Sequence, residues 1–237
     1  MTSNNFAVIG DVHGCIDEFS TMLDRLDQEG VREIFHLGDL VDRGPDSLGV
    51  VKLCRERGLR GVMGNHEWAL LRKLDSLKAG RNKDSSFDSE LALQLSYDAA
   101  SEAYLRSLPK LHVDDGFETL LVHGGLWPNL PLWKQPIAVM FAQLIHPNRP
   151  GDVRWWKIDQ KGISEEENYQ LGYRRWWEVT DEPYHVIYGH TVHDEPFVYG
   201  RTIGVDTGCV FGRALTAVIM PEKRFIKVAA KRTYVEK

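Results

Sequence analysis

A short apolar run that leads straight into a glycine-flanked polar turn occurs three times near the N-terminus. Residues 6–9 lead into Gly10-Asp11-Val12-His13-Gly14, residues 34–37 into Gly38-Asp39-Leu40, and residues 59–63 into Gly64-Asn65-His66-Glu67. Apolar residues at helical spacing separate the runs, so the pattern predicts strands that alternate with helices. Such alternation is typical of a parallel sheet with right-handed crossovers. Because the carboxyl ends of parallel strands meet at one edge of a sheet, the three turns are expected to converge there.

These turns carry side chains that bind metals, and two later turns add more. A hairpin predicted over residues 111–122 ends at His123-Gly124-Gly125, and a strand predicted over residues 185–188 ends at Gly189-His190-Thr191. The candidate ligands are Asp11, His13, Asp39, Asn65, His123 and His190. Carboxylate, imidazole and amide groups together suit divalent transition ions better than calcium or a structural zinc. A single Asp-x-His is weak evidence, but a series of such turns is specific.

The succession GDVHG, GDLVDRGPDS and GNHE, followed by the two histidine turns, resembles the phosphoprotein phosphatase branch of the calcineurin-like metallophosphoesterases. Within that family it is most similar to the small bacterial and phage protein phosphatases and to the bacterial diadenosine tetraphosphatase-like group. The resemblance runs from Phe6 to about Gly212. It implies an α/β fold: an α/β/β/α sandwich of two mixed sheets flanked by helices, with a bimetal site at the carboxyl ends of the strands.

The resemblance also implies how the six ligands are shared between two divalent transition-metal ions. Manganese is the preferred metal, with iron, zinc, nickel or cobalt as alternatives. Asp39 bridges both ions, and Asp11 and His13 complete the first site. The second site is completed by Asn65, His123 and His190. Such a pair of ions holds a bridging hydroxide as the nucleophile and clamps the phosphoryl oxygens.

His66 adjoins the candidate ligand Asn65 but is not itself assigned to a metal, so we predict that it protonates the leaving oxygen. Asp42 is its predicted partner, because a carboxylate on one ring nitrogen orients the imidazole. Arg43 offers a planar fork of donors, and the resemblance implies that it binds the substrate phosphate. The family has a second phosphate-binding arginine between the fourth and fifth motifs. The pattern here departs from that of the family, and Arg174 is preferred over Arg175 and Arg154.

The motifs leave more than one function open. The leading hypothesis is a metallophosphoesterase that acts as a phosphomonoesterase, similar to the serine/threonine protein phosphatases. The alternative is hydrolysis of a dinucleoside polyphosphate such as diadenosine tetraphosphate, because residues 188–212 resemble the diadenosine tetraphosphatase-like group. A third class, a non-catalytic phosphate-binding or scaffold protein, is disfavoured because no ligand position is substituted.

The length and charge of the chain set the remaining expectations. The 237 residues suit a single metallophosphoesterase domain over residues 1–237. The net charge of -5 predicts no general attraction to nucleic acid or to an anionic membrane. The resemblance implies that the partner is a phosphorylated substrate, either a phosphoprotein or a small phosphoester or nucleotide. No apolar run is long enough to span a membrane, and residues 1–5 do not read as a signal sequence. The three cysteines lack a C-x-x-C pair, as expected of reduced thiols in the cytoplasm.

Several local features complete the sequence-based expectations. Pro45 is expected at a first helical position, and Glu67 is expected to do no more than favour the start of its helix. One helix is predicted to run from Ser89 towards Leu105, after a polar surface loop over residues 79–89. The short strands from His185 onwards are predicted to form an antiparallel second sheet.

Two further segments are expected to be structural. The pairs Trp155-Trp156 and Trp176-Trp177 are predicted to lie in a core rather than against a nucleobase. Residues 204–209 are interpreted as a structural turn.

Overall fold

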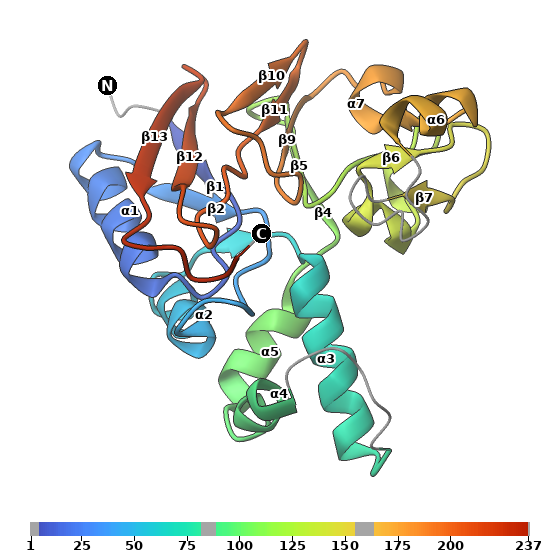
Figure 1. Ribbon diagram of the computed structural model, residues 1–237. Helices are drawn as coiled ribbons and strands as arrows, with labels where there is room; N and C mark the ends of the chain where they lie inside the picture. Colours follow the sequence, from blue (N-terminus) through green and yellow to red (C-terminus); the bar gives the residue numbers. More distant parts are fainter. Residues whose placement is uncertain (1–4, 82–88, 155–163, 237) are drawn as a thin grey trace.

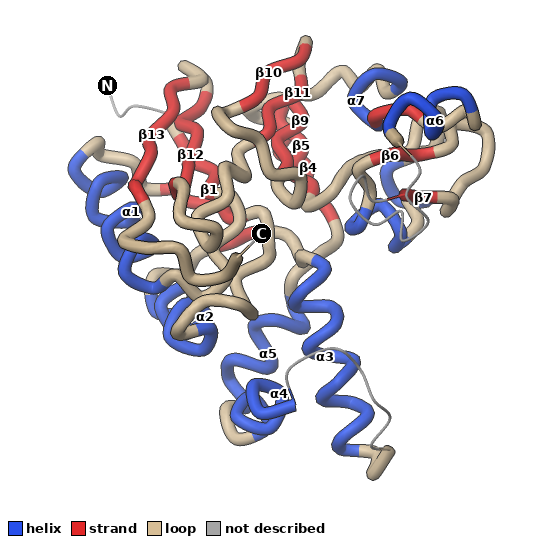
Figure 2. The backbone as a smooth tube through the Cα atoms, in the orientation of Figure 1, coloured by secondary structure: helices blue, strands red, loops and turns tan. Residues whose placement is uncertain are grey.

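The two large sheets of the protein face each other in the computed structural model, which describes residues 5–81, 89–154 and 164–236. Both sheets have five strands, and a third sheet has three. Helices α1 and α2 cover the outer face of the first sheet, and α6, α7 and the third sheet lie beyond the second (Figure 1). Helices α3, α4 and α5 project from one edge of the sandwich (Figure 2). The expected sandwich of two mixed sheets flanked by helices is confirmed.

The first sheet contains the three strand–helix units that the sequence predicts. Its strand order is β13-β12-β1-β2-β3. Strands β1, β2 and β3 pair in parallel: Phe6–Ile9, Glu33–His36 and Arg60–Gly61. The crossover helices are α1 (Ile16–Gln28) and α2 (Ser47–Glu56). The third strand is followed by α3 (Asn65–Lys78). The parallel arrangement is therefore confirmed, and the three polar turns lie at one edge.

Two C-terminal strands also join the first sheet, which the sequence did not predict. Strand β12 (Ala214–Met220) pairs antiparallel with β1 and with β13 (Arg224–Ala229). Nearly every residue of β12 is buried, because one of its faces meets the α1 side and the other meets the second sheet. The expectation that all short strands after His185 form one antiparallel sheet was wrong, because burial on both faces placed β12 beside β1.

The second sheet has the strand order β10-β11-β9-β5-β4. Its strands are β4 (Leu111–Asp114), β5 (Thr119–Val122), β9 (His185–Tyr188), β10 (Phe197–Tyr199) and β11 (Thr202–Gly204). The hairpin of β4 and β5 is antiparallel, as predicted, whereas β9 pairs in parallel with both β5 and β11. Parallel pairing brings the ends of β5 and β9 together, and these ends carry His123 and His190.

The remaining elements are short. The helices are α4 (Ser89–Ser96), α5 (Ala99–Ser107), α6 (Glu165–Gln170), α7 (Trp176–Val179) and the 3-10 turns η1 (Leu132–Lys134) and η2 (Ile137–Phe141). The third sheet consists of β6 (Leu144–Ile145), β7 (Val153–Arg154) and β8 (Arg174–Arg175). Among the described residues, no helix combines the length and apolar character needed to cross a membrane.

Two predicted helix boundaries were wrong because aspartate caps override them. Helix α2 begins at Ser47 rather than Pro45, since the Asp46 side chain accepts a hydrogen bond from the Gly49 N–H at 2.8 Å. The single helix predicted from Ser89 is divided into α4 and α5, because Asp98 accepts from the Ser101 N–H at 3.0 Å and starts a new helix. Most of the predicted polar loop, residues 82–88, lies outside the described residues.

The strands show why two sheets pack on each other. Ala7 and Ile9 of β1 face the cluster under α1, whereas Phe6 and Val8 face the cluster between the sheets. A third cluster lies on the far side of the second sheet and contains Trp176 and Trp177. This tryptophan pair is therefore in a core, as predicted, and Trp155-Trp156 lies outside the described residues.

Candidate metal centre

The turns after β1 and β2 are joined by their backbones. The N–H groups of Val12 and His13 both donate to the Asp39 carbonyl, at 3.0 and 2.7 Å. The Gly14 N–H donates to the Leu40 carbonyl at 2.8 Å. The first two motifs therefore form one unit, in which the Asp39 turn determines where Asp11 and His13 emerge.

Glu67 ties the third motif to the second, a role that the sequence analysis missed. Its side chain is fully buried. Its carboxylate accepts hydrogen bonds from the N–H groups of Asp39 at 2.7 Å, Leu40 at 2.8 Å and Val41 at 3.2 Å, and from Gly64 at 2.9 Å. The expectation that Glu67 only favours the start of α3 was therefore too narrow. Its position three residues after Gly64 signals the bond to Gly64, but no local signal announces the bonds to the Asp39 turn.

Asp39 lies at the middle of the candidate ligands. Its carboxylate is 3.6 Å from His13 Nε2 and 3.3 Å from His123 Nε2. Two groups of possible metal-binding atoms share it, each spanning no more than 4.8 Å: His13, Asp39 and His66, and Asp39, His123 and His190. A shared carboxylate between two clusters is the arrangement that a pair of bridged ions requires.

Backbone carbonyls orient the histidines of this cluster. His123 Nδ1 lies 2.8 Å from the Leu37 carbonyl, and His13 Nδ1 lies 3.0 Å from the Val41 carbonyl. The opposite nitrogen of each ring therefore faces Asp39. His123 Nε2 is also 2.8 Å from Asn65 Oδ1, which brings the amide into the same group. This is the arrangement in which a carbonyl fixes the ring of a metal-binding histidine.

Asp11 belongs to neither of the two groups, although it lies beside them. Both of its carboxylate oxygens accept from the His190 N–H, at 3.1 Å. A Cβ atom on Gly189 would collide with Asp11 Oδ1, so only glycine allows β9 to approach so closely. Asp11 thus joins the first sheet to the second at the candidate centre.

The buried charges of the cluster favour cations. Burial lowers the pKa of His13 and His190 to about 3, so both rings are neutral and can donate a lone pair. Burial, and then the carboxylate of Asp206, raise the pKa of Asp11 well above its ordinary value. Burial also raises the pKa of Asp206 to about 6. A cluster of buried carboxylates that disfavour one another's charge is stabilised by divalent ions.

Asp39 and His123 form a charged pair in spite of their burial, with His123 Nε2 3.3 Å from the carboxylate. Burial favours the neutral forms, but the charge of His123 holds the pKa of Asp39 well below its usual range. Burial lowers the pKa of His123. The charge of Asp39 outweighs burial and raises the pKa to about 10. Metal binding displaces protons from such ligands, so the donor set fits a metal centre.

Backbone strain is concentrated at this centre. Among the described residues, eight other than glycine have a positive φ. Five of them are candidate site residues, namely His13 (47°), Asp39 (50°), Asp42 (73°), Arg43 (71°) and His190 (60°). L-residues adopt this conformation at a cost of about 1–3 kcal/mol each, and it is found mostly where function requires it.

His66, Asp42 and Arg43, the residues predicted to act on the leaving oxygen and the phosphate, lie next to the cluster. His66 Nδ1 is 2.7 Å from Asp42 Oδ2. Burial raises the pKa of Asp42, but the hydrogen bond to His66 outweighs it and lowers the pKa below its ordinary value. Arg43 Nη1 lies 3.1 Å from His13 Nε2, and its guanidinium carbon lies 5.6 Å from the centre of the Phe211 ring.

Arg174 lies apart from these residues. From β8, its guanidinium donates to the carbonyls of Tyr169 in α6 and Tyr173, at 2.8 and 2.6 Å. Arg175 pairs with Glu165 at 2.9 Å and lies over Trp177. Arg154 donates to Asn168 at 3.1 Å. These contacts do not join the three arginines to the Asp39 cluster, so the second phosphate-binding arginine stays a prediction.

Comparison with known proteins identifies the class to which this fold and centre belong. Residues 5–200 match the family described as calcineurin-like phosphoesterase. The chain belongs to this family, and it is a phosphoester hydrolase of the metallophosphoesterase type.

Particular relatives match over nearly their whole length. The bis(5'-nucleosyl)-tetraphosphatase PrpE [asymmetrical] of Oceanobacillus iheyensis is 30% identical, with 96% of this chain and 93% of the relative covered. A symmetrical bis(5'-nucleosyl)-tetraphosphatase of Glaesserella parasuis serovar 5 is 29% identical, with 91% and 94% covered. A solved crystal structure, assigned provisionally as a diadenosine tetraphosphatase, has 27% identity and a TM-score of 0.74, with 95% and 93% covered.

Proposed function

We propose that this metallophosphoesterase hydrolyses dinucleoside polyphosphates, with diadenosine tetraphosphate as the model substrate. The observation that carries the proposal is the match to relatives named bis(5'-nucleosyl)-tetraphosphatases along almost all of both chains. Of the two substrate classes left open by the motifs, these relatives favour the dinucleoside polyphosphate over the phosphoprotein. One metallophosphoesterase domain over residues 1–237 is part of the proposal.

In this proposal the Asp39 cluster would hold two metal ions. Asp39 would serve both, and Asp11 and His13 would complete the first site. Asn65, His123 and His190 would complete the second. When bound, the ions supply positive charge to the phosphoryl oxygens and activate a water molecule for attack. Manganese is the proposed metal.

The proposed location of the protein is the cytoplasm. The three buried free thiols support a reducing environment of this kind.

The chain's own side chains have separate proposed tasks. Arg43 binds two oxygens of the reacting phosphate through its planar guanidinium. His66 protonates the oxygen that leaves, and Asp42, at 2.7 Å, holds its ring in place. Arg174 remains the proposed second arginine, and its hydrogen bonds to the carbonyls of Tyr169 and Tyr173 would have to be exchanged for phosphate.

A turnover panel tests this function. The purified protein, loaded in turn with manganese, zinc, cobalt, nickel or iron, is offered diadenosine tetraphosphate, a phosphoserine peptide and p-nitrophenyl phosphate. The proposal expects the highest kcat/KM on diadenosine tetraphosphate, and the best metal to be manganese. A higher kcat/KM on the phosphopeptide than on the dinucleotide would contradict the proposal and favour a serine/threonine phosphatase activity.

A further inference from the structure

Asp206 follows the end of a strand in the same way as a candidate metal ligand on the neighbouring strand. Strand β11 pairs in parallel with β9, and Gly204 lies opposite Tyr188 at the last pair of this ladder. Asp206 and His190 each come two residues after that pair. Because the two strands are parallel, they deliver both side chains to the same edge of the second sheet. The proposed ligand set includes His190 but not Asp206.

The backbone at Asp206 packs tightly against the loop that carries Asp11. A Cβ atom on Gly10 would lie 2.5 Å from the Val205 carbonyl oxygen and 3.3 Å from the Asp206 nitrogen, so only glycine permits this approach. The Asp206 carbonyl also accepts from the His193 N–H at 2.9 Å. Asp206 is only 4% exposed. Its carboxylate is therefore buried where the loops of the two large sheets meet.

A turn hydrogen bond accounts for one oxygen of this carboxylate. Asp206 Oδ1 accepts from the Gly208 N–H at 2.9 Å, in keeping with the structural turn expected over residues 204–209. An asparagine could make the same bond, because the bond needs only one oxygen. A buried charge is unfavourable unless a cation compensates it. The turn therefore does not explain why the residue is a carboxylate.

The charged groups around Asp206 do not balance its charge in a metal-loaded centre. Burial disfavours the charge, and so do the carboxylates of Asp39 and Asp11. His123 and Arg43 favour it. However, a histidine that binds a metal is neutral, so His123 can offer its charge only while the centre is empty.

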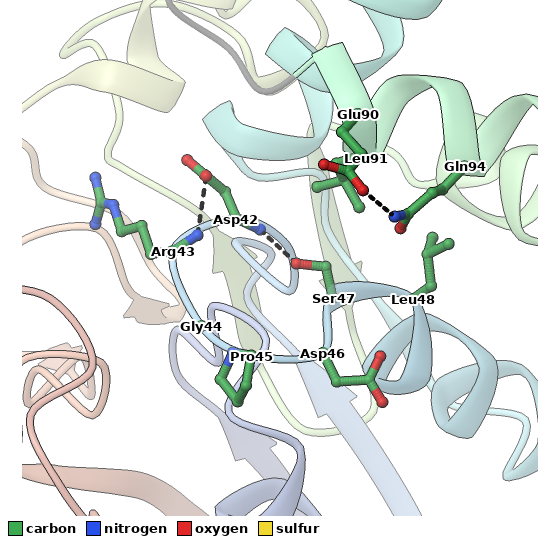
Figure 3. Close-up of a pocket in the computed structure, with 10 residues that line it drawn as sticks. All are labelled: Asp42, Arg43, Gly44, Pro45, Asp46, Ser47, Leu48, Glu90, Leu91 and Gln94. Carbon is green, nitrogen blue, oxygen red and sulfur yellow. Dashed lines mark hydrogen bonds between the residues drawn. The ribbon is translucent and has the colours of Figure 1, made fainter.

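Arg43 is the other cation near Asp206, and it is directed at different partners. Its side chain extends away from Glu90 and Gln94 of α4 (Figure 3), and its Nη1 lies 3.1 Å from His13 Nε2. In the described part of the chain, no hydrogen bond or ion pair joins Arg43 to Asp206. Arg43 therefore offsets the charge of Asp206 only at a distance, and a divalent ion is the cation that the position suits.

We propose that Asp206 is a positioning residue of the first metal site, where its carboxylate adds a negative charge beside Asp11 and raises the affinity for a divalent ion. The inference rests on the proposed metal centre, in which Asp39 serves both ions and the first ion has fewer ligands than the second. Charges act strongly on one another in a buried site, so a carboxylate can favour an ion without binding it directly.

Metal binding by Asp206→Asn, measured without any substrate, tests this role. Asparagine keeps an oxygen for the Gly208 N–H and removes only the charge. We expect one of two manganese ions to bind about 10- to 100-fold more weakly, the usual effect of a residue just outside the ligands, and the other to keep its affinity. Titration with a competing chelator measures the affinities. The electron paramagnetic resonance spectrum of bound manganese shows at which metal concentration the coupled pair of ions forms.

The matched control is Asp114→Asn. Asp114 Oδ1 also accepts a turn N–H, from Phe117 at 3.2 Å, and Asp114 lies opposite Thr119, at the other end of β5 from His123. The control should bind both ions as the wild type does. Urea denaturation without metal separates charge from structure. Asp206→Asn should unfold at the wild-type urea concentration or a higher one, because it removes a buried charge that faces other carboxylates.

Three results would overturn the role of Asp206. Wild-type affinity for both ions in Asp206→Asn would do so, and weaker inhibition by inorganic phosphate in the same variant would then assign Asp206 to Arg43. Equal weakening of both ions with a loss of metal-free stability beyond that of Asp114→Asn would make Asp206 a structural residue. Failure of the wild type to bind two ions would remove the metal centre itself. If the wild type does not hydrolyse diadenosine tetraphosphate but the metal defect of Asp206→Asn is present, the proposed function fails and the role of Asp206 stands.

Discussion

The loops of the first sheet and the histidines of the second sheet meet at the same centre but are held in different ways. On the first-sheet side, the Asp39 turn receives hydrogen bonds from the β1 loop and gives three of its N–H groups to Glu67. On the second-sheet side, His123 is oriented by the Leu37 carbonyl, and the His190 N–H donates to Asp11. The second side is thus placed by contacts that cross the interface between the sheets.

Because the two sides are held differently, we expect substitutions on one side to change mainly the stability of the fold and substitutions on the other to change mainly metal binding. Removing a group that holds the Asp39 turn leaves several buried N–H groups without an acceptor, which destabilises the fold. Removing a histidine of the second sheet deletes a proposed ligand but leaves the first-sheet loops joined. We therefore expect first-sheet substitutions at Glu67 to lower stability and second-sheet substitutions at His190 to lower metal affinity.

The largest expected effect is in His66→Asn, which removes the proposed proton donor and its hydrogen bond to Asp42 but leaves the backbone hydrogen bonds that join the first-sheet loops. Loss of a general acid lowers kcat by ~10²- to 10⁴-fold. The loss should be greater on phosphoserine than on p-nitrophenyl phosphate, because nitrophenolate leaves readily as an anion. Measured kcat on both substrates, with metal content and the free energy of unfolding, checks this. An equal loss on both substrates would contradict the role, and loss of metal would make His66 a ligand, as its grouping with His13 and Asp39 would allow.

The next largest effect is expected in Glu67→Ala, which tests directly whether Glu67 holds the first-sheet loops in place. Four N–H groups lose their acceptor, so we expect the free energy of unfolding of the metal-free protein to fall by about 4 kcal/mol. Glu67→Gln keeps one carbonyl oxygen and is the matched control, with a smaller loss. Urea denaturation measures both. If Glu67→Ala unfolds at the wild-type urea concentration, these hydrogen bonds do not hold the Asp39 turn.

His190→Asn tests the second-sheet side. Asparagine tolerates the positive φ of this position, so the backbone is preserved while the imidazole is removed. We expect metal affinity to fall by about 100-fold, and the free energy of unfolding without metal to change by less than about 1 kcal/mol. Titration with a competing chelator measures the first and urea denaturation the second. The comparison between the two sides would fail if His190→Asn destabilised the metal-free protein as much as Glu67→Ala.

The smallest expected effect is in Phe211→Leu, which removes the aromatic ring beside Arg43. The backbone of Phe211 is paired with Thr233 of the C-terminal segment. An exposed cation–π contact corresponds to about a threefold change in binding. We expect KM to rise by about this factor with kcat nearly unchanged. Phe225→Leu, at a partly buried ring packed between the sheets, is the control that should leave KM alone. A change in kcat without a change in KM would show that Phe211 does not position Arg43.

Much of the first-sheet side could be predicted from the sequence because its information is local. Apolar runs, helical spacing and glycine-flanked turns located β1, β2 and the residues after them. His66, Asp42 and Arg43 were placed beside the cluster for the same reason, since they follow the same turns within a few residues. The pairing of β12 with β1 was not predictable in this way. The periodicity of a strand indicates which of its residues are buried, but it does not indicate which other strand it pairs with.

The sequence by itself determined the kinds of side chain at the strand ends, because metal ligands and glycines are readable without coordinates. Tertiary structure alone decided that one buried carboxylate, Glu67, would hold the turn of another motif, and that Arg174 would lie on the carbonyls of Tyr169 and Tyr173. It also decided the positive φ angles at His13, Asp39 and His190. The physical reason is that these conformations are unfavourable in isolation and persist only where contacts from distant parts of the chain enforce them.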